Sequence, residues 1–262
     1  MGLLYECGGG LVNSQFARSN FNMDAYLFSS GPSLSGVDMS LFEQAPVFKV
    51  GINTTYPKIR PDLWIGMDIP QCFNSNLWME PFPKILRAPF ANRTITETSK
   101  KKVKDFPLVY FAKIDNEITA NPHKEILKRR AHKVNFIWTN NTLTTSLHIL
   151  IWMGFKRIHL LGSDFGGDGE NNYFDDSEDA RPFNHDKRSP SGKISKSQHE
   201  KNQVLYRQQI KFLKSFVEVA EHKNVEIISC SKSSPANCFL NFMEPSEAVN
   251  QSKIRSKELV GQ

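Results

Sequence analysis

The sequence predicts an α/β protein built on one open, mostly parallel sheet with helices on both faces. Two observations support this fold class. Short apolar runs of strand length recur along the chain and end in glycine, serine, asparagine or aspartate, which disfavour strands. Within residues 140–174, an apolar stripe at helical spacing is followed by Gly154 and then by the run RIHLLG. A helix that feeds a buried strand ending in a polar loop is the local plan of an open α/β sheet, which binds ligands at the carboxyl ends of its strands.

Length and composition indicate one domain. The chain has 262 residues, of which 39% are hydrophobic and 23% charged, so a packed core is expected and global disorder is not. We expect an N-terminal extension over residues 1–23 and a folded domain over residues 24–245. This domain includes a polar lid at about residues 175–203. Residues 246–262 are polar and charged, and we expect a C-terminal tail that frays.

Charge and cysteine usage exclude several classes of protein. Much of the net charge of +6 lies in two lysine-rich runs without a nucleic-acid motif, so no nucleic-acid partner is expected. The four cysteines lack the CxxC spacing of zinc sites, which points to reduced thiols and a cytoplasmic protein. No stretch of about 18 apolar residues occurs, so we expect no integral membrane segment, and peripheral association with the inner membrane stays open.

The first three strands are expected to end at one edge of the sheet. The first, Ala25–Phe28, breaks into the small-residue turn SSGPSL, where backbone N–H groups can face a phosphate or a sugar hydroxyl. The second, residues 47–52, precedes Asn53, and the third, within PDLWIGMDIP, has Asp68 at its carboxyl end. Because parallel strands share one carboxyl edge, Ser30, Asn53 and Asp68 should lie close together.

The rest of the chain supplies further strands, two helices and the lid. We expect a capped helix after Asn140 that ends at Gly154. Residues 175–203 have almost no apolar side chains, as expected of a lid over a site. A second helical stripe includes Leu205, Leu213 and Phe216, and SSPANCFLNF is expected to pack back on the sheet. The remaining strands are expected in KILRAPF, FPLVYFA, RIHLLG and VEIIS, and KVNFIW leads into the stretch 140–174.

Several of these segments, in the same order, resemble the bacterial sialyltransferases that decorate lipooligosaccharide. The segments are SSGPSL, the strand ending at Asn53, PDLW..MD, LHILIWMGFKRIHLLGSDF, the later Tyr173 and ISCSKSSPANCF, and together they span residues 25–243. A wider superfamily that includes the 6-hydroxymethylpterin pyrophosphokinase-like proteins shares the GPSL turn, the PDxxxxxD segment and the helix–Gly–strand–GxD block. The resemblance implies a Rossmann-like sheet that binds a nucleotide, in the sialyltransferases the cytidine monophosphate (CMP) half of an activated sialic acid.

The resemblance also implies roles for individual residues. Tyr173 falls on a tyrosine that holds the departing phosphate, and His199 is the nearest equivalent of the catalytic base. A histidine can take a proton from a sugar hydroxyl near neutral pH. Asp68 stands where the sialyltransferases have an asparagine and the wider superfamily has an aspartate. The expected nucleotide-binding residues are Ser30, Gly31, Ser33, Asn53, Asp68, Thr142, Gly162 and Asp164.

Two departures from the family pattern leave the donor and the chemistry open. Gly166 replaces a second phosphate-binding tyrosine, and Thr139 replaces an arginine ahead of the helix. The expected function is a glycosyltransferase-like enzyme, with a nucleotide-activated sugar as donor. The expectation extends to a CMP-linked, sialic acid-like donor, a cell-surface glycan acceptor, a place in lipopolysaccharide biosynthesis and no cofactor.

Two alternative functions and the oligomeric state also stay open. One alternative is a pyrophosphokinase-like enzyme with Mg²⁺ bridging Asp68 or Asp164 to a diphosphate. The other is a catalytically inactive protein that binds a nucleotide or a glycan. Related sheets often assemble, so a homo-oligomer is a further open possibility.

Overall fold

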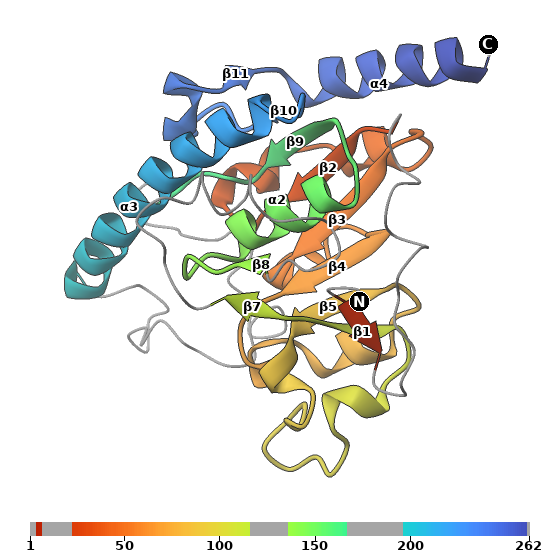
Figure 1. Cartoon of the computed structure of the whole chain (residues 1–262), viewed down its shortest axis with the longest axis vertical. Helices are drawn as coiled ribbons and strands as arrows, with labels where there is room; N and C mark the ends of the chain where they lie inside the picture. The colour runs from red at the N-terminus through yellow and green to blue at the C-terminus, as the bar shows by residue number, and fades with distance from the viewer. Residues whose placement is uncertain (1–3, 7–22, 116–135, 167–195, 261–262) are drawn as a thin grey trace.

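Nine strands form one sheet in the computed structural model, which describes residues 4–6, 23–115, 136–166 and 196–260 (Figure 1). Their order is β1-β6-β5-β4-β3-β2-β9-β10-β11, and every neighbouring pair is parallel except β1 and β6. The open, mostly parallel sheet predicted from the sequence is confirmed. The strands are β1 Leu4–Glu6, β2 Ala25–Phe28, β3 Phe48–Ile52, β4 Leu63–Gly66, β5 Lys84–Arg87, β6 Val109–Ala112, β9 Arg157–Leu161, β10 Glu226–Ser229 and β11 Asn241–Phe242.

The chain reverses its direction of winding at β2. From β2 it proceeds through β3, β4 and β5 to β6 on one side, and it returns to β9, β10 and β11 on the other. The carboxyl ends of β2 and β9 therefore lie side by side at a topological switch point. Open α/β sheets place their ligands in the crevice outside the strand ends at such a point.

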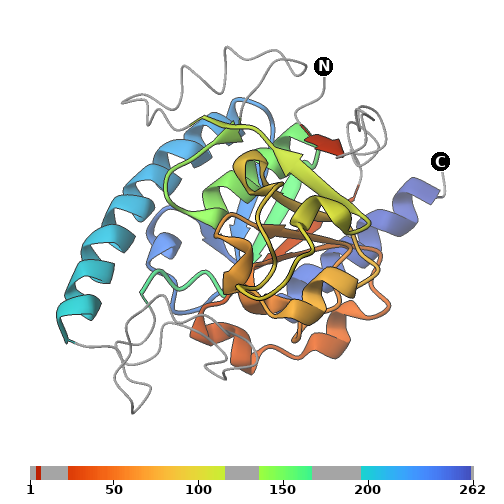
Figure 2. The same ribbon diagram turned by 90° about the horizontal axis from the view of Figure 1, so that it is seen from below.

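Both faces of the sheet are covered by helices, as the sequence predicts. Ala25 and Leu27 of β2 belong to the same buried cluster as residues of α2 (Thr142–Trp152) and α3 (Lys196–Glu221). The alternate residues Tyr26 and Phe28 pack with Phe42 and with residues of α4 (Pro245–Val260). Figure 2 shows α3 and α4 on opposite sides of the strands. Strands that are buried on both faces read as continuous apolar runs, which explains the sequence of β2.

Helix α2 begins and ends where its sequence signals predict. The Asn141 side chain accepts a hydrogen bond from the Leu143 amide at 2.7 Å, which caps the first turn. Gly154 follows the helix with φ of 96°, a conformation that a residue without Cβ adopts readily. The helix buries its apolar side chains Leu143, Leu147 and Leu150 against the sheet. The helix therefore delivers its amino end to the carboxyl edge of the sheet and feeds β9.

The segment KVNFIW, which leads into α2, forms a strand outside the main sheet. Its residues Phe136–Ile137 form β8, which pairs in parallel with β7 (Ile114–Asp115) in a separate two-stranded sheet. Helix α2 supplies part of the missing hydrogen bonding, because the Ile137 amide donates to Nδ1 of His148 and the Ile137 carbonyl accepts from Thr145 Oγ1. Side chains of α2 thus take the place of a second neighbouring strand beside β8.

Both ends of the domain differ from the sequence-based expectations. Part of the N-terminal extension, β1, pairs antiparallel with β6 at the edge of the sheet. The expected fraying tail is wrong, because residues 245–260 form α4 and bury Ala248, Val249 and Ser252. The described part of the expected lid segment also differs, since α3 already begins at Lys196. None of the helices in the described ranges combines the length and apolar character needed to cross a bilayer.

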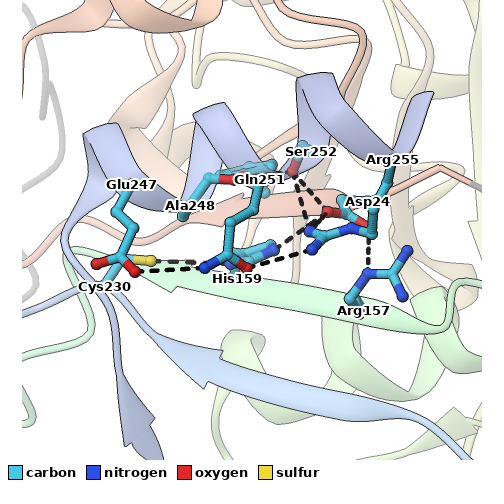
Figure 3. Close-up of polar contacts among 10 residues, drawn as sticks. Asp24, Arg157, His159, Cys230, Glu247, Ala248, Gln251, Ser252 and Arg255 are labelled. Carbon is cyan, nitrogen blue, oxygen red and sulfur yellow. Dashed lines mark hydrogen bonds and ion pairs between the residues drawn. The ribbon is translucent and has the colours of Figure 1, made fainter. Parts of the chain in front are cut away.

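Buried charge holds α4 to the amino-terminal edge of the sheet (Figure 3). The Asp24 carboxylate accepts hydrogen bonds from Arg157 Nε at 2.7 Å, Ser252 Oγ at 2.5 Å and the Arg255 guanidinium. His159 Nε2 lies 3.5 Å from the same carboxylate. Burial alone would raise the pKa of Asp24, but hydrogen bonds from His159, Ser252 and Arg255 and the charge of Arg157 hold it well below its usual value. This cluster lies at the opposite ends of the strands from the switch point.

Candidate functional site

A cleft of about 230 Å³ opens at the carboxyl edge of the sheet, over the switch point. Seven of the eight residues predicted to bind a nucleotide line it: Ser30, Gly31, Asn53, Asp68, Thr142, Gly162 and Asp164. They come from the ends of β2, β3, β4 and β9 and from the first turn of α2. Because these positions are up to 134 residues apart in sequence (164 minus 30), their convergence is a property of the sheet order. The tertiary structure therefore brings the predicted residues together as expected.

The floor of the cleft is a close contact between the turns after β2 and β9. The Gly31 amide donates to the Gly162 carbonyl at 2.8 Å, and a Cβ on Gly31 would lie 2.3 Å from that oxygen. Gly162 has φ of 65°, and a Cβ there would lie 2.1 Å from the Ser29 carbonyl oxygen. Neither position can hold a larger residue without moving backbone, so the glycines of SSGPSL and GSD set the spacing of the two turns.

Asp164 acts within this floor as a structural acceptor. Its Oδ2 accepts a hydrogen bond from the Ser33 amide at 2.8 Å, and its Oδ1 accepts one from Ser233 Oγ at 3.3 Å. The side chain is 6% exposed. Ser33 is the one predicted nucleotide-binding residue that does not line the cleft. The turn amide that could have met a phosphate thus bonds to a carboxylate of the protein itself.

A serine-rich loop after β10 fixes the turn after β9. The Ser163 amide donates to Ser231 Oγ at 3.0 Å, and Ser234 Oγ donates to the Ser163 carbonyl at 2.7 Å. The hydroxyls of Ser163 and Ser29 are 3.2 Å apart. The segment ISCSKSSPANCF, which is part of the sequence resemblance, therefore works by holding residues 162–164 in place.

Asn53 presents a buried acceptor to the cleft. Its backbone has φ of 54°, which asparagine tolerates better than most residues, and its carbonyl accepts a hydrogen bond from the Trp64 indole at 2.9 Å. The side-chain Oδ1 is buried and has no hydrogen-bond partner among the described residues. A buried acceptor without a partner is costly, by about 1–3 kcal/mol. A ligand hydroxyl or amino group would satisfy it.

The amino end of α2 forms another wall of the cleft. Asn140, Asn141, Thr142 and Leu143 all line it. The first N–H groups of a helix and its macrodipole favour negative charge. Asn141 caps the Leu143 amide, so the protein's own side chain fixes this end of the helix.

One rim of the cleft carries groups that the sequence motifs did not indicate. Trp138 lines the cleft, and the Arg87 guanidinium carbon lies 4.9 Å from its ring centroid. Burial lowers the pKa of Arg87, and the nearby charge of Asp68 opposes this effect. Arg87 ends β5, so the rule that placed Ser30, Asn53 and Asp68 at the carboxyl edge could have found it.

Helix α3 supplies the wall that sequence reasoning missed. Leu205, Tyr206 and Gln209 line the cleft, and Gln209 Nε2 donates to the Asn140 carbonyl at 3.5 Å. The sequence predicts this helix and its apolar stripe, but it does not indicate which other residues face the site. Only the packing of α3 across the strand ends reveals them.

The two predicted catalytic residues are not placed in the site. Tyr173 lies outside the described residues. His199 belongs to the first turn of α3, and its side chain is outside the described part of the structure. Their roles stay predictions. In the sequence, both residues lie between Gly166 and Leu205, which line the cleft.

No protein-family model matches the chain, and no curated protein matches it in sequence. Similar solved structures are those of the Campylobacter jejuni sialyltransferase CstII with cytidine-5'-monophosphate and of sialyltransferase CST-II with a trisaccharide acceptor and CMP. Both have 14% identity and a TM-score of 0.46, cover 86% of this chain, and are covered over 86% and 87% of their own length, respectively. A CST-II variant with CMP has 14% identity, a TM-score of 0.49 and coverage of 86% and 88%. All three structures are of sialyltransferases, and the sequence motifs resemble sialyltransferases as well.

Proposed function

We propose that this protein is a glycosyltransferase-like enzyme that uses a nucleotide-activated sugar, with a CMP-linked, sialic acid-like donor as the first candidate. The observation that supports the proposal is the cleft at the switch point. It gathers seven residues that the sequence motifs had assigned to a nucleotide, together with the amino end of α2. The cleft is somewhat smaller than the ~300–1,000 Å³ of typical small-molecule sites, and it suits one part of a nucleotide.

The lining matches the chemistry of a nucleoside monophosphate. Asn53 Oδ1 can accept a hydrogen bond from a ribose hydroxyl or from an exocyclic amino group. Trp138 offers an aromatic face to a base, and such stacking is worth about 1–3 kcal/mol. The first turn of α2 can receive a phosphate. Thr142 lies at that turn, where its hydroxyl can add a donor.

The proposed reaction is an in-line displacement at the anomeric carbon of the donor. A hydroxyl oxygen of the acceptor glycan forms the new bond to that carbon, while the bond from the carbon to the phosphate oxygen breaks. The electron pair of that bond leaves with the nucleotide phosphate. His199 takes the proton of the attacking hydroxyl, and Tyr173 donates a hydrogen bond to the charge that grows on the phosphate. A cell-surface glycan, as in lipopolysaccharide biosynthesis, is the proposed acceptor.

The geometry of Asp164 disfavours the magnesium-dependent alternative. That alternative uses Asp164 or Asp68 as metal ligands, but both oxygens of Asp164 already accept hydrogen bonds from Ser33 and Ser233. Asp68 is exposed at the rim of the cleft, beside Arg87. Within the described ranges, no group of three or more histidine, cysteine, aspartate or glutamate residues could hold a metal ion.

A thermal-shift screen tests the proposal. The purified protein is heated with cytidine, uridine, guanosine and adenosine nucleotides, each with and without magnesium, because a ligand that binds only the folded state raises the melting temperature. We expect CMP at 100 times its dissociation constant to stabilise the protein by about 2.7 kcal/mol without metal. A response to adenosine nucleotides that requires magnesium would replace the proposal with the pyrophosphokinase-like alternative.

Turnover separates an enzyme from a binding protein. The expected result is hydrolysis of CMP-linked sialic acid above the background rate, and a loss of at least about 100-fold in His199→Ala, the usual size of a general-base contribution. The variant His222→Ala, at the other end of the same helical region, is the control. Binding of CMP without any turnover of the donor would support the catalytically inactive alternative.

A further inference from the structure

Gly166 and the ring of Tyr206 lie in close contact in the wall of the cleft. Gly166 has φ of +119°, and an ideal Cβ built on it would lie 3.1 Å from Cδ2 of Tyr206 and 2.8 Å from Nε2 of Gln203. A Cβ at position 166 would require the end of the Gln203 side chain to move and the Tyr206 ring to shift by a few tenths of an ångström. The glycine lets the tyrosine ring approach the loop after β9, and Tyr206 lines the cleft beside it.

The helix holds Tyr206 at this place from both sides. Gln203, Tyr206 and Gln209 are three residues apart and therefore share one face of α3. Gln203 Nε2 donates to the Gly166 carbonyl at 3.4 Å, and Gln209 Nε2 donates to the Asn140 carbonyl at 3.5 Å. Tyr206 thus lies between two anchors, the loop after β9 and the amino end of α2. In Figure 1, this first half of α3 extends beyond its contact with β10.

The described lining of the cleft contains no lysine, arginine or histidine. The described lining therefore offers a phosphate neutral donors, which are backbone N–H groups, hydroxyls, amides and a phenol, while the Arg87 guanidinium lies at the rim against Trp138. The turn after β2 contributes less than its sequence indicates, because its Gly31 and Ser33 amides already bond within the protein. Among the described residues that line the cleft, Tyr206 is the only one that carries a phenol.

A phenol is well suited to this position. Its hydroxyl is a stronger donor than that of serine or threonine, and a donor fixed in advance is most effective where negative charge grows during a reaction. The amino end of α2 also lines the cleft, and its N–H groups favour the same charge. An anion in the cleft that reaches both groups would be stabilised by both.

We propose that Tyr206 donates a hydrogen bond to the phosphate of the nucleotide in the cleft. This assignment rests on the proposed function, since it requires a nucleotide as the ligand. It adds to the site a phosphate-binding residue from α3, more than 30 residues after the loop that the ring packs against.

The test compares CMP with cytidine, which lacks the phosphate, in the full chain. Affinities are measured by NMR titration, which reaches the millimolar range, for the wild type and for Tyr206→Phe, which removes only the hydroxyl. We expect CMP to bind about 10–100-fold more weakly to the variant, as for a lost hydrogen bond to a charged group of ~1.5–3 kcal/mol. Cytidine should bind both proteins equally well.

Two further variants separate the hydroxyl from the ring and from stability. Tyr206→Leu removes the ring as well as the hydroxyl. If this variant loses affinity for cytidine while Tyr206→Phe binds both ligands as the wild type does, the ring packs on the base. That result would overturn the proposal. Tyr26→Phe removes a phenol that bonds to Ser252 at 2.8 Å on the opposite edge of the sheet. This control should melt at a lower temperature with an unchanged ratio of CMP to cytidine affinity.

The remaining outcomes distinguish this proposal from the proposed function. If the wild type binds CMP and Tyr206→Phe binds it equally well, the assignment of Tyr206 is wrong and the proposed function stands. If Tyr206→Phe loses the same factor for CMP and cytidine, the hydroxyl does not act on the phosphate. If the wild type binds no nucleotide, the proposed function itself fails and this assignment fails with it.

Discussion

Replacing Asp24 by asparagine should show how strongly one buried carboxylate holds the two ends of the chain together. Asp24 precedes β2, and its carboxylate bonds to Arg157 of β9 and to Ser252 and Arg255 of α4 (Figure 3). Asparagine has nearly the same shape but no charge, and its amide nitrogen cannot accept a hydrogen bond. Asp24→Asn therefore leaves two arginines facing a neutral group while the packing is kept.

The magnitude follows from the burial of the partners. Removing one member of a fully buried ion pair destabilises a protein by about 3–5 kcal/mol. The Asp24 side chain is 2% exposed, but those of Arg157 and Arg255 are 27% and 25% exposed and keep some hydration. We therefore expect Asp24→Asn to lower the free energy of unfolding by about 3 kcal/mol, which lowers the melting temperature by about 6–12 °C for a protein of this size.

The pH dependence gives an independent check with a defined sign. The folded-state pKa of Asp24 lies well below its ordinary value of 3.8, so the unfolded chain binds the proton more tightly than the folded chain. The stabilisation is therefore fully present above about pH 4 and is lost as the pH falls through the folded-state pKa, with a slope of up to about 1.4 kcal/mol per pH unit. Asp24→Asn should lose this part of the acid dependence.

Urea unfolding followed by tryptophan fluorescence, repeated at several pH values from 2 to 7, measures both effects. The control is Asp38→Asn, because Asp38 is exposed and only caps a short 3-10 helix through the Ser40 amide. It should leave the unfolding midpoint at pH 7 nearly unchanged. Equal stability of Asp24→Asn and wild type at pH 7, or parallel acid limbs, would refute the assigned role of this carboxylate.

Three further predictions concern the hydroxyl on α4, the floor of the cleft and a buried lysine. Ser252→Ala removes the hydroxyl that bonds to Asp24 and Tyr26, so we expect a loss of about 1–2 kcal/mol in urea unfolding, and an unchanged midpoint would contradict the contact. Gly31→Ala should lower the melting temperature and abolish stabilisation by CMP, because the new Cβ would lie 2.4 Å from Asp164 Oδ2. The control Gly36→Ala should do neither, because its Cβ would have no heavy atom within 4 Å. Burial lowers the pKa of Lys84 from 10.5 to about 8. Between these two pH values the unfolded chain keeps a proton on Lys84 that the folded chain has released, so the free energy of unfolding rises with pH in this window. Lys84→Met should remove that rise, and parallel curves of stability against pH for the variant and the wild type would refute the prediction.

The sequence by itself determined the local elements whose signals are local. Helical spacing, Asn141 and Gly154 specify α2, and the apolar run after Gly154 specifies β9, because capping and hydrophobic periodicity act within a few residues. Polar residues after β2, β3 and β4 could be assigned to one edge, because parallel strands share a carboxyl edge whatever their order.

The sequence signals for α4 were present but weak. Pro245 at the first helical position and Glu247 in the first turn favour a helix start. The buried residues Ala248, Val249 and Ser252 are small, so the segment reads as polar overall, and its helix is held by Asp24 at the other end of the chain. A contact between residues 228 positions apart leaves no periodic trace in the sequence.

The tertiary structure alone decided the content of the cleft. It placed β2 beside β9, engaged the Ser33 amide with Asp164, and brought Tyr206 of α3 beside Gly166. Each of these depends on which surfaces pack together, since a carboxylate or a phenol has the same local sequence signature whether it meets a ligand or a backbone amide. Long-range packing free energy, and not local propensity, selects between these partners, and this is the physical reason that the residues of the site could be predicted better than their roles.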